Sequence, residues 1–423
     1  MSLFKSQLHG LQWVKKTFGL EPRWTLLPDL EVLKRTLQSF KPSSKVKVTF
    51  LAQGAFNKLY DVKIDGENLV MRVSLPVDPC YKTLSEVATV NWIRRTTNLS
   101  VPTIIRYEPS GDNPVGFEWI LMTKLSGKTL AESWRYLPLT AKSNLVRQLA
   151  THIACQFRNQ LSGIGNIYAL PSSIGTSPTV GRIVSMHFFW GDHIYQDIYR
   201  GPFRSSKDWI TTRLSISEHD CLSVLGKNPV GEDLESDDDD EVEDATRTLE
   251  IIRKLRPLLS YVFPVDDQGQ EPSIIFHDDL SRNNILVNDN GDLTGVLDWE
   301  CVSALPLWKA CYYPSFLEGR PRHSEPDLGR YHREANGEPS ELYWEHLWEY
   351  ETTLLRQMFI KEMERLEPGW VEVFNTSQVQ RDFDIAVQNC DNEFVARHIN
   401  KWIHDITAGG HNVRSLRDRI DNS

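Results

Sequence analysis

The sequence predicts an α+β protein of two lobes, in which an antiparallel sheet lobe with one helix precedes a larger, mainly helical lobe. Three observations predict it. Between residues 45 and 125, short apolar stretches alternate with turns, as β-strands do, and one stretch has helical spacing. Beyond residue 126, apolar residues recur mainly at helical spacing. A chain of 423 residues is also too long for one ordinary core.

Residues 45–125 are predicted to form the smaller lobe. The expected strands cover residues 46–51, 59–64, 68–73, 103–107 and 117–123, and the expected helix covers residues 83–96. Asp65-Gly66-Glu67 separates the second and third strands and is typical of a hairpin. Residues 1–44 are expected to form a helical N-terminal extension.

Residues 126–423 are predicted to form the helical lobe. Long helices are expected at residues 141–161, 343–363 and 384–406, with another at 246–263 that Pro257 should kink or split. Short apolar strands are expected at residues 273–276, 285–287 and 293–297. Residues 226–245 are predicted to be an acidic, disordered insertion, because ten acids and no base lie between residues 232 and 244.

Composition excludes several classes of protein. The formal net charge is -10, and without the ten clustered acids the chain is near neutral, so no strong basic field for nucleic acid is expected. No apolar run approaches the ~20 residues that cross a bilayer, so no membrane partner is expected. The six cysteines are scattered without metal-ligand spacing, which indicates reduced thiols and a cytoplasmic location. The mildly basic first 24 residues leave a mitochondrial alternative, and the oligomeric state stays open.

Polar residues gather on two neighbouring hairpins. His277 and Asp279 follow one apolar strand, and Asn284, five positions after Asp279, precedes the next. Asp298 follows a further apolar run, fourteen residues after Asn284. We expect these side chains to meet at the mouths of adjacent strands. Mg²⁺ prefers few protein oxygens together with water and phosphate oxygens, and phosphoryl transfer needs a base and neutralising cations. The pattern therefore favours phosphoryl transfer.

These motifs resemble the aminoglycoside phosphotransferase and choline kinase group of kinase-like enzymes. His277-Asp278-Asp279-Leu280 with Asn284-Ile285-Leu286 is similar to that family's HGDLxxxNIL loop, with Asp278 in the usual glycine position, and Leu297-Asp298-Trp299-Glu300 is similar to its DWE-type metal motif. The resemblance implies a bilobal protein-kinase-like fold with ATP and Mg²⁺ as cofactors. It further implies Asp279 as catalytic base, Asn284 and Asp298 as magnesium ligands, and His277 as a buttress of the loop.

The resemblance also implies a nucleotide site in the smaller lobe. Gly54 lies in a turn between two strands, where the family has its phosphate-covering loop, although an ordinary hairpin is an open alternative. Arg72 occupies the position of the basic residue that faces the phosphates, and Glu86 is its expected ion-pair partner. Backbone groups near Met122 and Lys124 are expected to hold the adenine ring, with Met122 as plain core the alternative.

The acceptor is the least determined part of the prediction. Residues 185–190 and 193–203 carry aromatic side chains that either wall an acceptor pocket or pack a long insertion. Gly201-Pro202-Phe203 and Pro306-Leu307-Trp308 resemble fungal members of the family without an assigned substrate, so an antibiotic-resistance enzyme is not expected.

The leading interpretation is an enzyme that moves the γ-phosphoryl group of ATP to a hydroxyl, or an amine, of a small molecule. An alcohol group is the favoured acceptor. Two alternatives remain: a pseudokinase that acts as a scaffold or nucleotide sensor, and an atypical protein or lipid kinase. The first interpretation is preferred because Asp298-Trp299 replaces the DFG motif and no APE-like motif follows within residues 300–331.

Overall fold

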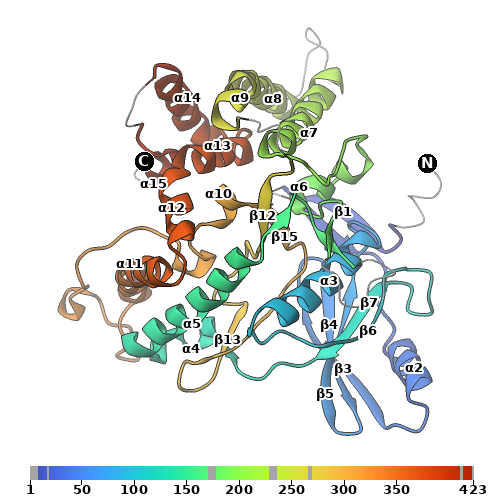
Figure 1. Ribbon diagram of the computed structural model, residues 1–423. Coiled ribbons are helices and arrows are strands. Elements are labelled where there is room, and N and C mark those ends of the chain that lie inside the picture. Colours follow the sequence, from blue (N-terminus) through green and yellow to red (C-terminus); the bar gives the residue numbers. More distant parts are fainter. Residues whose placement is uncertain are drawn as a thin grey trace.

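The structure is a computed structural model. It describes residues 8–421 except 17–18, 170–177, 228–235, 265–268 and 410–412. Figure 1 shows a sheet lobe at the lower right and helices at the left and top, so the predicted α+β architecture of two lobes is confirmed. Among the described residues, no helix has both the length and the apolar character that crossing a bilayer requires.

The smaller lobe is built on a five-stranded antiparallel sheet in the order β3-β4-β5-β7-β6. Its strands are β3 (Val46–Gln53), β4 (Asn57–Ile64), β5 (Glu67–Ser74), β6 (Ile104–Glu108) and β7 (Glu118–Thr123). Helix α2 (Leu30–Phe40) packs Leu33 and Leu37 on one face of the sheet. Helix α3 (Tyr81–Thr96) packs Val87 on the other face.

The alternation of side chains along β5 decides which residues can reach the interior between the lobes. Leu69, Met71 and Val73 belong to the cluster under α2, whereas Val70 packs beside Val87 of α3. Successive side chains of a strand point to opposite faces, so residue 72 lies on the α3 face.

The prediction of a helical extension over residues 1–44 is wrong for its first half. Strands β1 (Leu11–Lys16) and β2 (Gly19–Trp24) form an antiparallel hairpin, and only α2 is helical. Tertiary packing explains the difference, because Trp13 of the hairpin contacts Trp190 of the helical lobe with ring centroids 4.9 Å apart. Asp29 caps α2 by accepting hydrogen bonds from two backbone N–H groups of its first turn.

The larger lobe contains the long helices α5 (Leu139–Arg158) and α11 (Glu341–Leu366), which pack on each other at the left of Figure 1. Its short sheets have the orders β15-β12-β9, β14-β13-β8 and β10-β11. The strands are β8 (Lys128–Thr129), β9 (Leu161–Ser162), β10 (Ile167–Tyr168), β11 (Thr179–Val180), β12 (Pro272–Phe276), β13 (Ile285–Val287), β14 (Leu293–Val296) and β15 (Ser303–Pro306).

The other α-helices of this lobe lie mostly around these sheets. They are α4 (Leu130–Ser133), α6 (Met186–Phe189), α7 (Ser206–Lys227), α8 (Ser236–Leu255), α9 (Leu259–Val262), α10 (Leu307–Ala310), α12 (Pro368–Thr376), α13 (Gln378–Gln388), α14 (Glu393–Thr407) and α15 (Leu416–Asp421). Short 3-10 turns occur at Trp134–Tyr136, His193–Tyr195, Arg256–Leu258, Ser315–Leu317 and Leu328–Arg330.

The structure confirms one prediction for this lobe and contradicts two others. A turn at Pro257 separates α8 from α9, as expected. The single helix expected over residues 384–406 is wrong, because α13 ends before Asn392, whose side chain caps α14. The prediction of disorder over residues 226–245 is wrong where the chain is described, because residues 226–227 end α7 and residues 236–245 belong to α8. Residues 228–235 of that segment lie outside the described chain. Ala245 and Leu249 of α8 are buried against Cys221 of α7, and this packing offsets the repulsion among the acids.

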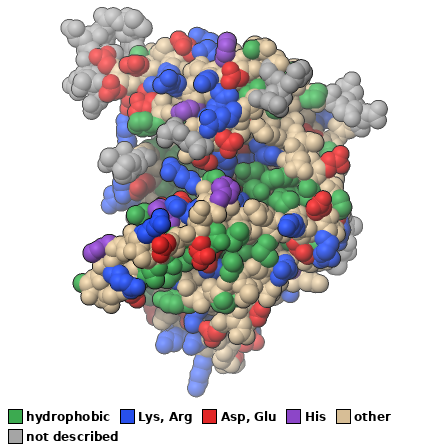
Figure 2. Space-filling view, turned by 90° about the vertical axis from the view of Figure 1, so that its left-hand side faces the viewer, with side chains coloured by type: hydrophobic (Ala, Val, Ile, Leu, Met, Phe, Trp, Pro, Cys, Tyr) green, Lys and Arg blue, Asp and Glu red, His purple; other side chains and the backbone are tan. Residues whose placement is uncertain are grey.

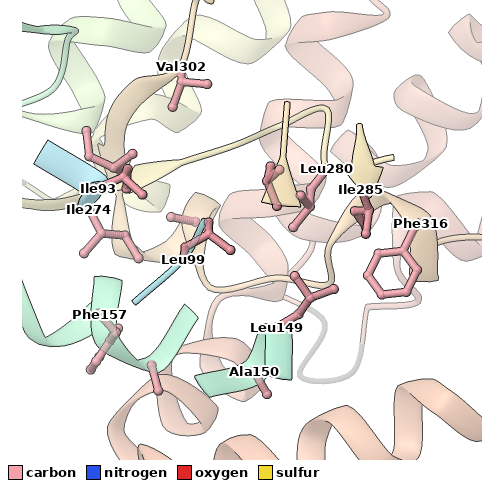
Figure 3. Packing of buried hydrophobic residues seen from close by; sticks show 14 of the residues in the cluster. Ile93, Leu99, Leu149, Ala150, Phe157, Ile274, Leu280, Ile285, Val302 and Phe316 are labelled. Atoms are coloured by element: carbon pink, nitrogen blue, oxygen red, sulfur yellow. The ribbon is translucent and has the colours of Figure 1, made fainter. Parts of the chain in front are cut away.

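Charges of both signs are interspersed over the face drawn in Figure 2, with hydrophobic side chains gathered near its centre. The core beneath is a large cluster shared by the β12–β14 region, α5 and α11. Figure 3 shows Leu280 and Ile285 pointing into this core near Phe316. Leu280 lies within a polar loop and Ile285 directly follows it, so the core holds this loop at two points.

Candidate active site

The loop between β12 and β13, residues 277–284, is here called the HD loop. It begins at His277, which is buried and whose Nε2 donates a hydrogen bond to the carbonyl of Leu297 (2.9 Å). The imidazole also makes an edge contact with the ring of Trp299, with centroids 5.0 Å apart. His277 therefore links the HD loop to the loop that carries Asp298, which agrees with a buttressing role.

Asp279 is exposed at the tip of the HD loop, but its orientation is fixed. The side-chain amide of Asn284 donates to both the carbonyl oxygen (2.9 Å) and the carboxylate Oδ2 (2.8 Å) of Asp279. These bonds use the nitrogen of the amide and leave its oxygen directed elsewhere. The loop thus offers one oriented carboxylate and one amide oxygen.

The second loop, residues 297–301, is here called the DWE loop. The N–H of Leu297 donates to the carbonyl of Asn284 (2.8 Å), so the two loops are adjacent. Asp298 has a left-handed backbone (φ 60°), a conformation that is uncommon for residues other than glycine. The indole of Trp299 is buried and donates to the carbonyl of Val296 (3.0 Å). Buried contacts therefore hold the strained backbone in place.

The carboxylate of Asp298 lies in a recess at the junction of the lobes. Its side chain is 41% exposed, yet protein atoms surround it at longer range. This desolvation and the nearby charge of Glu300 raise the pKa of Asp298, against the opposing effect of Arg72. The positive charges near Asp298 therefore compensate its carboxylate only in part.

Arg72 brings the smaller lobe into the site. The expected ion pair with Glu86 of α3 is present and buried, and Nη1 of Arg72 lies 3.4 Å from Oδ1 of Asp298. Arg72 reaches this position because it projects from the α3 face of β5. The structure thus brings together Arg72, Glu86 and Asp298, while Asp279 and Asn284 lie on the adjacent loop.

The sequence interpretation missed a second buried charge pair at this junction. Lys82, in the first turn of α3, has its Nζ 2.5 Å from Oε2 of Glu300 in the DWE loop. The amide of Asn57 also donates to that oxygen (2.7 Å). Burial alone would raise the pKa of Glu300, but Lys82, Arg72 and the hydrogen bond from Asn57 lower it to about 2. The only sequence signal was that Lys82 precedes Glu86 by one helical turn.

The remaining predicted nucleotide residues lie in the smaller lobe. Gly54 is exposed in the turn between β3 and β4, and its N–H donates to the carbonyl of Asn57 (2.9 Å). Met122 is buried in the small cluster with Val87, so its side chain is core, the alternative that the sequence left open. The Lys124 N–H donates to the carbonyl of Asn68 (3.2 Å). The nucleotide roles of Gly54, Met122 and Lys124 stay predictions.

A cavity of about 1140 Å³ opens beside the HD loop and contains the exposed Asp278 in its lining. From the two segments predicted to wall an acceptor pocket, five residues contribute: Ser185, Met186, His187, Trp190 and His193. In contrast, Phe188, Phe189 and Phe203 are fully packed core residues. The packing interpretation is therefore confirmed for these three residues, whereas an acceptor pocket lined by the others stays a prediction.

The oxygen atoms that the HD loop and the DWE loop offer decide whether Mg²⁺ can bind between them. In the described part of the chain, no three His, Cys, Asp or Glu side chains are arranged to hold a metal. The amide oxygen of Asn284 and the carboxylate of Asp298 remain as hard oxygen donors on adjacent loops. Two protein oxygens with phosphate and water oxygens suit Mg²⁺, which keeps much of its hydration. The residues present fit this ion.

A family model identifies the same region. Residues 227–308, which contain both loops, match the family described as "Phosphotransferase enzyme family". The resemblance predicted from the two motifs is thereby confirmed.

Curated relatives are fungal. A subtelomeric hrmA-associated cluster protein of Aspergillus fumigatus is 26% identical over 309 residues, which cover 63% of this chain and 59% of the relative. The clavilactone A biosynthesis cluster protein Y of Ampulloclitocybe clavipes is 25% identical over 74% of both chains. The mitochondrial Altered inheritance of mitochondria protein 9 of Saccharomyces cerevisiae is 22% identical over 69% of this chain and 52% of its own length. This chain thus spans little more than half of two of these relatives.

Solved structures align over most of the chain at low similarity. Aminoglycoside phosphotransferase APH(4)-Ia covers 91% of this chain with 16% identity and a TM-score of 0.44. The putative aminoglycoside phosphotransferase of Ralstonia eutropha covers 94% with 11% identity and a TM-score of 0.42.

Proposed function

We propose that this chain is an ATP- and Mg²⁺-dependent phosphotransferase that acts on a hydroxyl, or an amine, of a small molecule. The proposal rests on the arrangement of charged and polar side chains at the junction of the lobes. There, Asn284 orients the exposed carboxylate of Asp279, and Arg72 contacts both Glu86 and Asp298. The family match and the intact motifs support the same reaction class.

In the proposed reaction, Asp279 accepts the proton of the attacking hydroxyl. A bond forms between the acceptor oxygen and the γ-phosphorus, the bond from that phosphorus to the β–γ bridging oxygen breaks, and ADP leaves with the electron pair. The hydrogen bond from Asn284 holds the Asp279 carboxylate ready, because an oriented base avoids the entropic cost of finding the proton.

The nucleotide phosphates are proposed to lie between Arg72 and the DWE loop. Arg72 offers a guanidinium whose planar donors suit phosphate oxygens, and Glu86 fixes its direction. When bound, Mg²⁺ supplies positive charge that neutralises the phosphate oxygens, with Asn284 and Asp298 as the residues that would hold it. Gly54, in its open turn, is proposed to cover the phosphates.

The acceptor is proposed to occupy the cavity beside the HD loop. Its volume of about 1140 Å³ suits a small organic molecule. Several charges of its wall compensate one another, since Arg213 and Lys309 both pair with Asp384, and Arg417 pairs with Glu318. These paired acids are poor ligands for a polycation, which favours a neutral or singly charged acceptor.

Asp278 differs from Asp384 and Glu318 of the cavity wall, which both have ion-pair partners. Although its side chain reaches the surface of the cavity, the surrounding protein desolvates it and raises the pKa of Asp278, against the opposing effects of His277 and Lys309. Among the described residues it forms no ion pair within 4 Å. We infer that Asp278, beside the proposed base, orients the acceptor by accepting a hydrogen bond from it.

The test is ATP consumption with a library of small hydroxyl and amine compounds, together with untargeted detection of phosphorylated products. We expect one or more pools to yield a product with wild type and essentially none with Asp279→Asn. Asp289→Asn is the matched control, because Asp289 is an exposed aspartate on the next turn, where it pairs with Lys128. Equal ATP consumption by wild type and Asp279→Asn in every pool would refute the catalytic assignment.

A further inference from the structure

Lys82 is an unusual lysine because it is only 1% exposed, although it lies in the first turn of a helix at the junction of the lobes. Its ammonium reaches Glu300 at 2.5 Å, the side-chain oxygen of Asn57 at 3.0 Å and the hydroxyl of Ser74 at 3.4 Å. Asn57 begins β4 and Ser74 ends β5. The ammonium therefore joins one helix and two strands of the sheet lobe to a loop of the helical lobe.

Glu300 receives its partners from the sheet lobe. Its Oε2 accepts from both Lys82 and Asn57, and Asn57 is itself held by the hydroxyl of Ser74 (2.8 Å). Both partners of Glu300 are more than two hundred positions away in the sequence. Because Oε2 accepts from two donors of the sheet lobe, Glu300 anchors the DWE loop to that lobe.

The DWE loop needs such an anchor because its backbone is strained on both sides of Glu300. Asp298 (φ 60°) and Cys301 (φ 58°) both adopt the left-handed conformation, which surrounding contacts must enforce. Trp299 fixes the loop to the helical lobe. Glu300, the next residue, fixes it to the sheet lobe. Asp298 therefore directly precedes Trp299 and Glu300, the two residues that fix the loop to the two lobes.

We propose that Lys82 is a positioning residue that holds Asp298 in place through Glu300. The inference rests on the proposed function, because an effect of Lys82 on magnesium binding requires that Asp298 is the magnesium ligand. Lys82 and Glu300 couple the arrangement of the lobes to that ligand, so the site is complete only when the sheet lobe is seated on the DWE loop. Glu86, one turn further along α3, pairs with Arg72 of β5. This separate ion pair does not replace the contact between Lys82 and Glu300.

The experiment compares Lys82→Met with Lys142→Met. Lys142 is also buried and also paired with a glutamate, since its Nζ lies 2.6 Å from Glu351, but this pair joins α5 to α11 within the helical lobe. Binding of Mg²⁺ with a non-hydrolysable ATP analogue is measured by calorimetry. We expect affinity to fall roughly 10–100-fold in Lys82→Met, as is typical when a supporting contact of a metal ligand is lost. Lys142→Met should bind as wild type does.

Hydrogen exchange of residues 297–302 without ligand tests positioning independently of nucleotide binding. We expect faster exchange there in Lys82→Met and unchanged exchange in Lys142→Met. Unchanged exchange in Lys82→Met would overturn the inference even if wild type binds nucleotide. If exchange accelerates but wild type shows no magnesium-dependent binding, the proposed function fails while the positioning contact stands.

Two further variants separate positioning from folding. Lys82→Met with Glu300→Gln removes both charges, so no unpaired buried carboxylate remains to destabilise the chain. If the pair served stability alone, this double variant would bind the nucleotide analogue as wild type does, and the inference would be overturned. We expect its affinity to stay low even when its melting temperature recovers. Lys82→Arg, which keeps the charge, should recover part of the affinity.

Discussion

The HD loop and the DWE loop lie side by side, but different parts of the molecule hold them. The HD loop is held in the core of the helical lobe by Leu280 within it and Ile285 directly after it, and its exposed Asp279 is oriented by a residue of the same loop. The DWE loop takes essential contacts from the sheet lobe, through Lys82 and Arg72. The comparison teaches that the proposed base is set by one lobe, whereas the proposed metal ligand depends on both.

The largest expected effect is on turnover, and it falls on the HD loop. Asp279→Ala should lower the turnover number about 10²–10⁴-fold, because both proton acceptance and orientation are lost. Binding of MgATP and the melting temperature should change little, since Asp279 is exposed and its side chain is held by Asn284 of the same loop. Steady-state kinetics and calorimetry check this split. A comparable loss of nucleotide affinity would mean that the two loops are not independent.

The next effect separates stability from site geometry. Lys142→Met leaves Glu351 buried without its cation and should lower the free energy of unfolding by about 3–5 kcal/mol. This pair lies within the helical lobe, so MgATP affinity should remain at the wild-type value at temperatures where the variant is folded. Denaturant titration and calorimetry measure both quantities. A matching loss of affinity would contradict the view that only the interlobe pair supports the site.

A smaller effect concerns the support of α3. The carboxylate of Glu118 accepts hydrogen bonds from the Thr83 hydroxyl (2.5 Å) and the Cys80 N–H (2.7 Å), which ties the start of the helix to β7. Burial raises the pKa of Glu118 to about 7, against these hydrogen bonds and Lys82. Its folded pKa exceeds its unfolded value, so its contribution to stability is present below about pH 4.5 and is lost as pH rises towards 7.

Glu118→Gln should remove this part of the pH dependence. Relative to wild type, the variant should gain about 2–3 kcal/mol in unfolding free energy between pH 5 and pH 8, whatever its absolute stability. Denaturant titrations at both pH values provide the comparison. Parallel pH profiles for the two proteins would show that Glu118 does not titrate in the folded state over this range.

The smallest effect is expected at the turn between β3 and β4. A Cβ at Gly54 meets no atom within 4 Å, so Gly54→Ala should change the unfolding free energy by less than about 0.5 kcal/mol. If phosphates approach this backbone, MgATP affinity should fall roughly two- to tenfold, at most about 1.4 kcal/mol. Unchanged affinity would assign Gly54 to an ordinary hairpin, the alternative that the sequence left open.

Local patterns predicted the sheet and the motifs well. Short apolar stretches bounded by turns, and the polar residues that follow apolar strands, are local signals. The second of these signals led to Asp279, Asn284 and Asp298. The ion pair of Arg72 with Glu86 was also expected, although its motivation came from the family resemblance. Most of the correct predictions thus came from patterns among residues that are close together in the sequence.

The features that were missed depend on contacts between distant segments. The hairpin over residues 11–24 is stabilised by packing on Trp190, and the helix in the acidic run by burial on α7. Lys82 and Glu300 look like ordinary surface charges until the two lobes meet. A single sequence contains no periodic signal for such a pair, because its partners are separated by 218 positions, from 82 to 300.

The most direct test of the account is the thermal shift that MgATP produces in wild type and in Asp298→Ala. A ligand that binds only the folded chain raises the melting temperature in proportion to its binding free energy. We predict a clear shift for wild type with Mg²⁺ and ATP together, and its loss in Asp298→Ala. Equal shifts for the two proteins would contradict the role of Asp298 at the junction of the lobes.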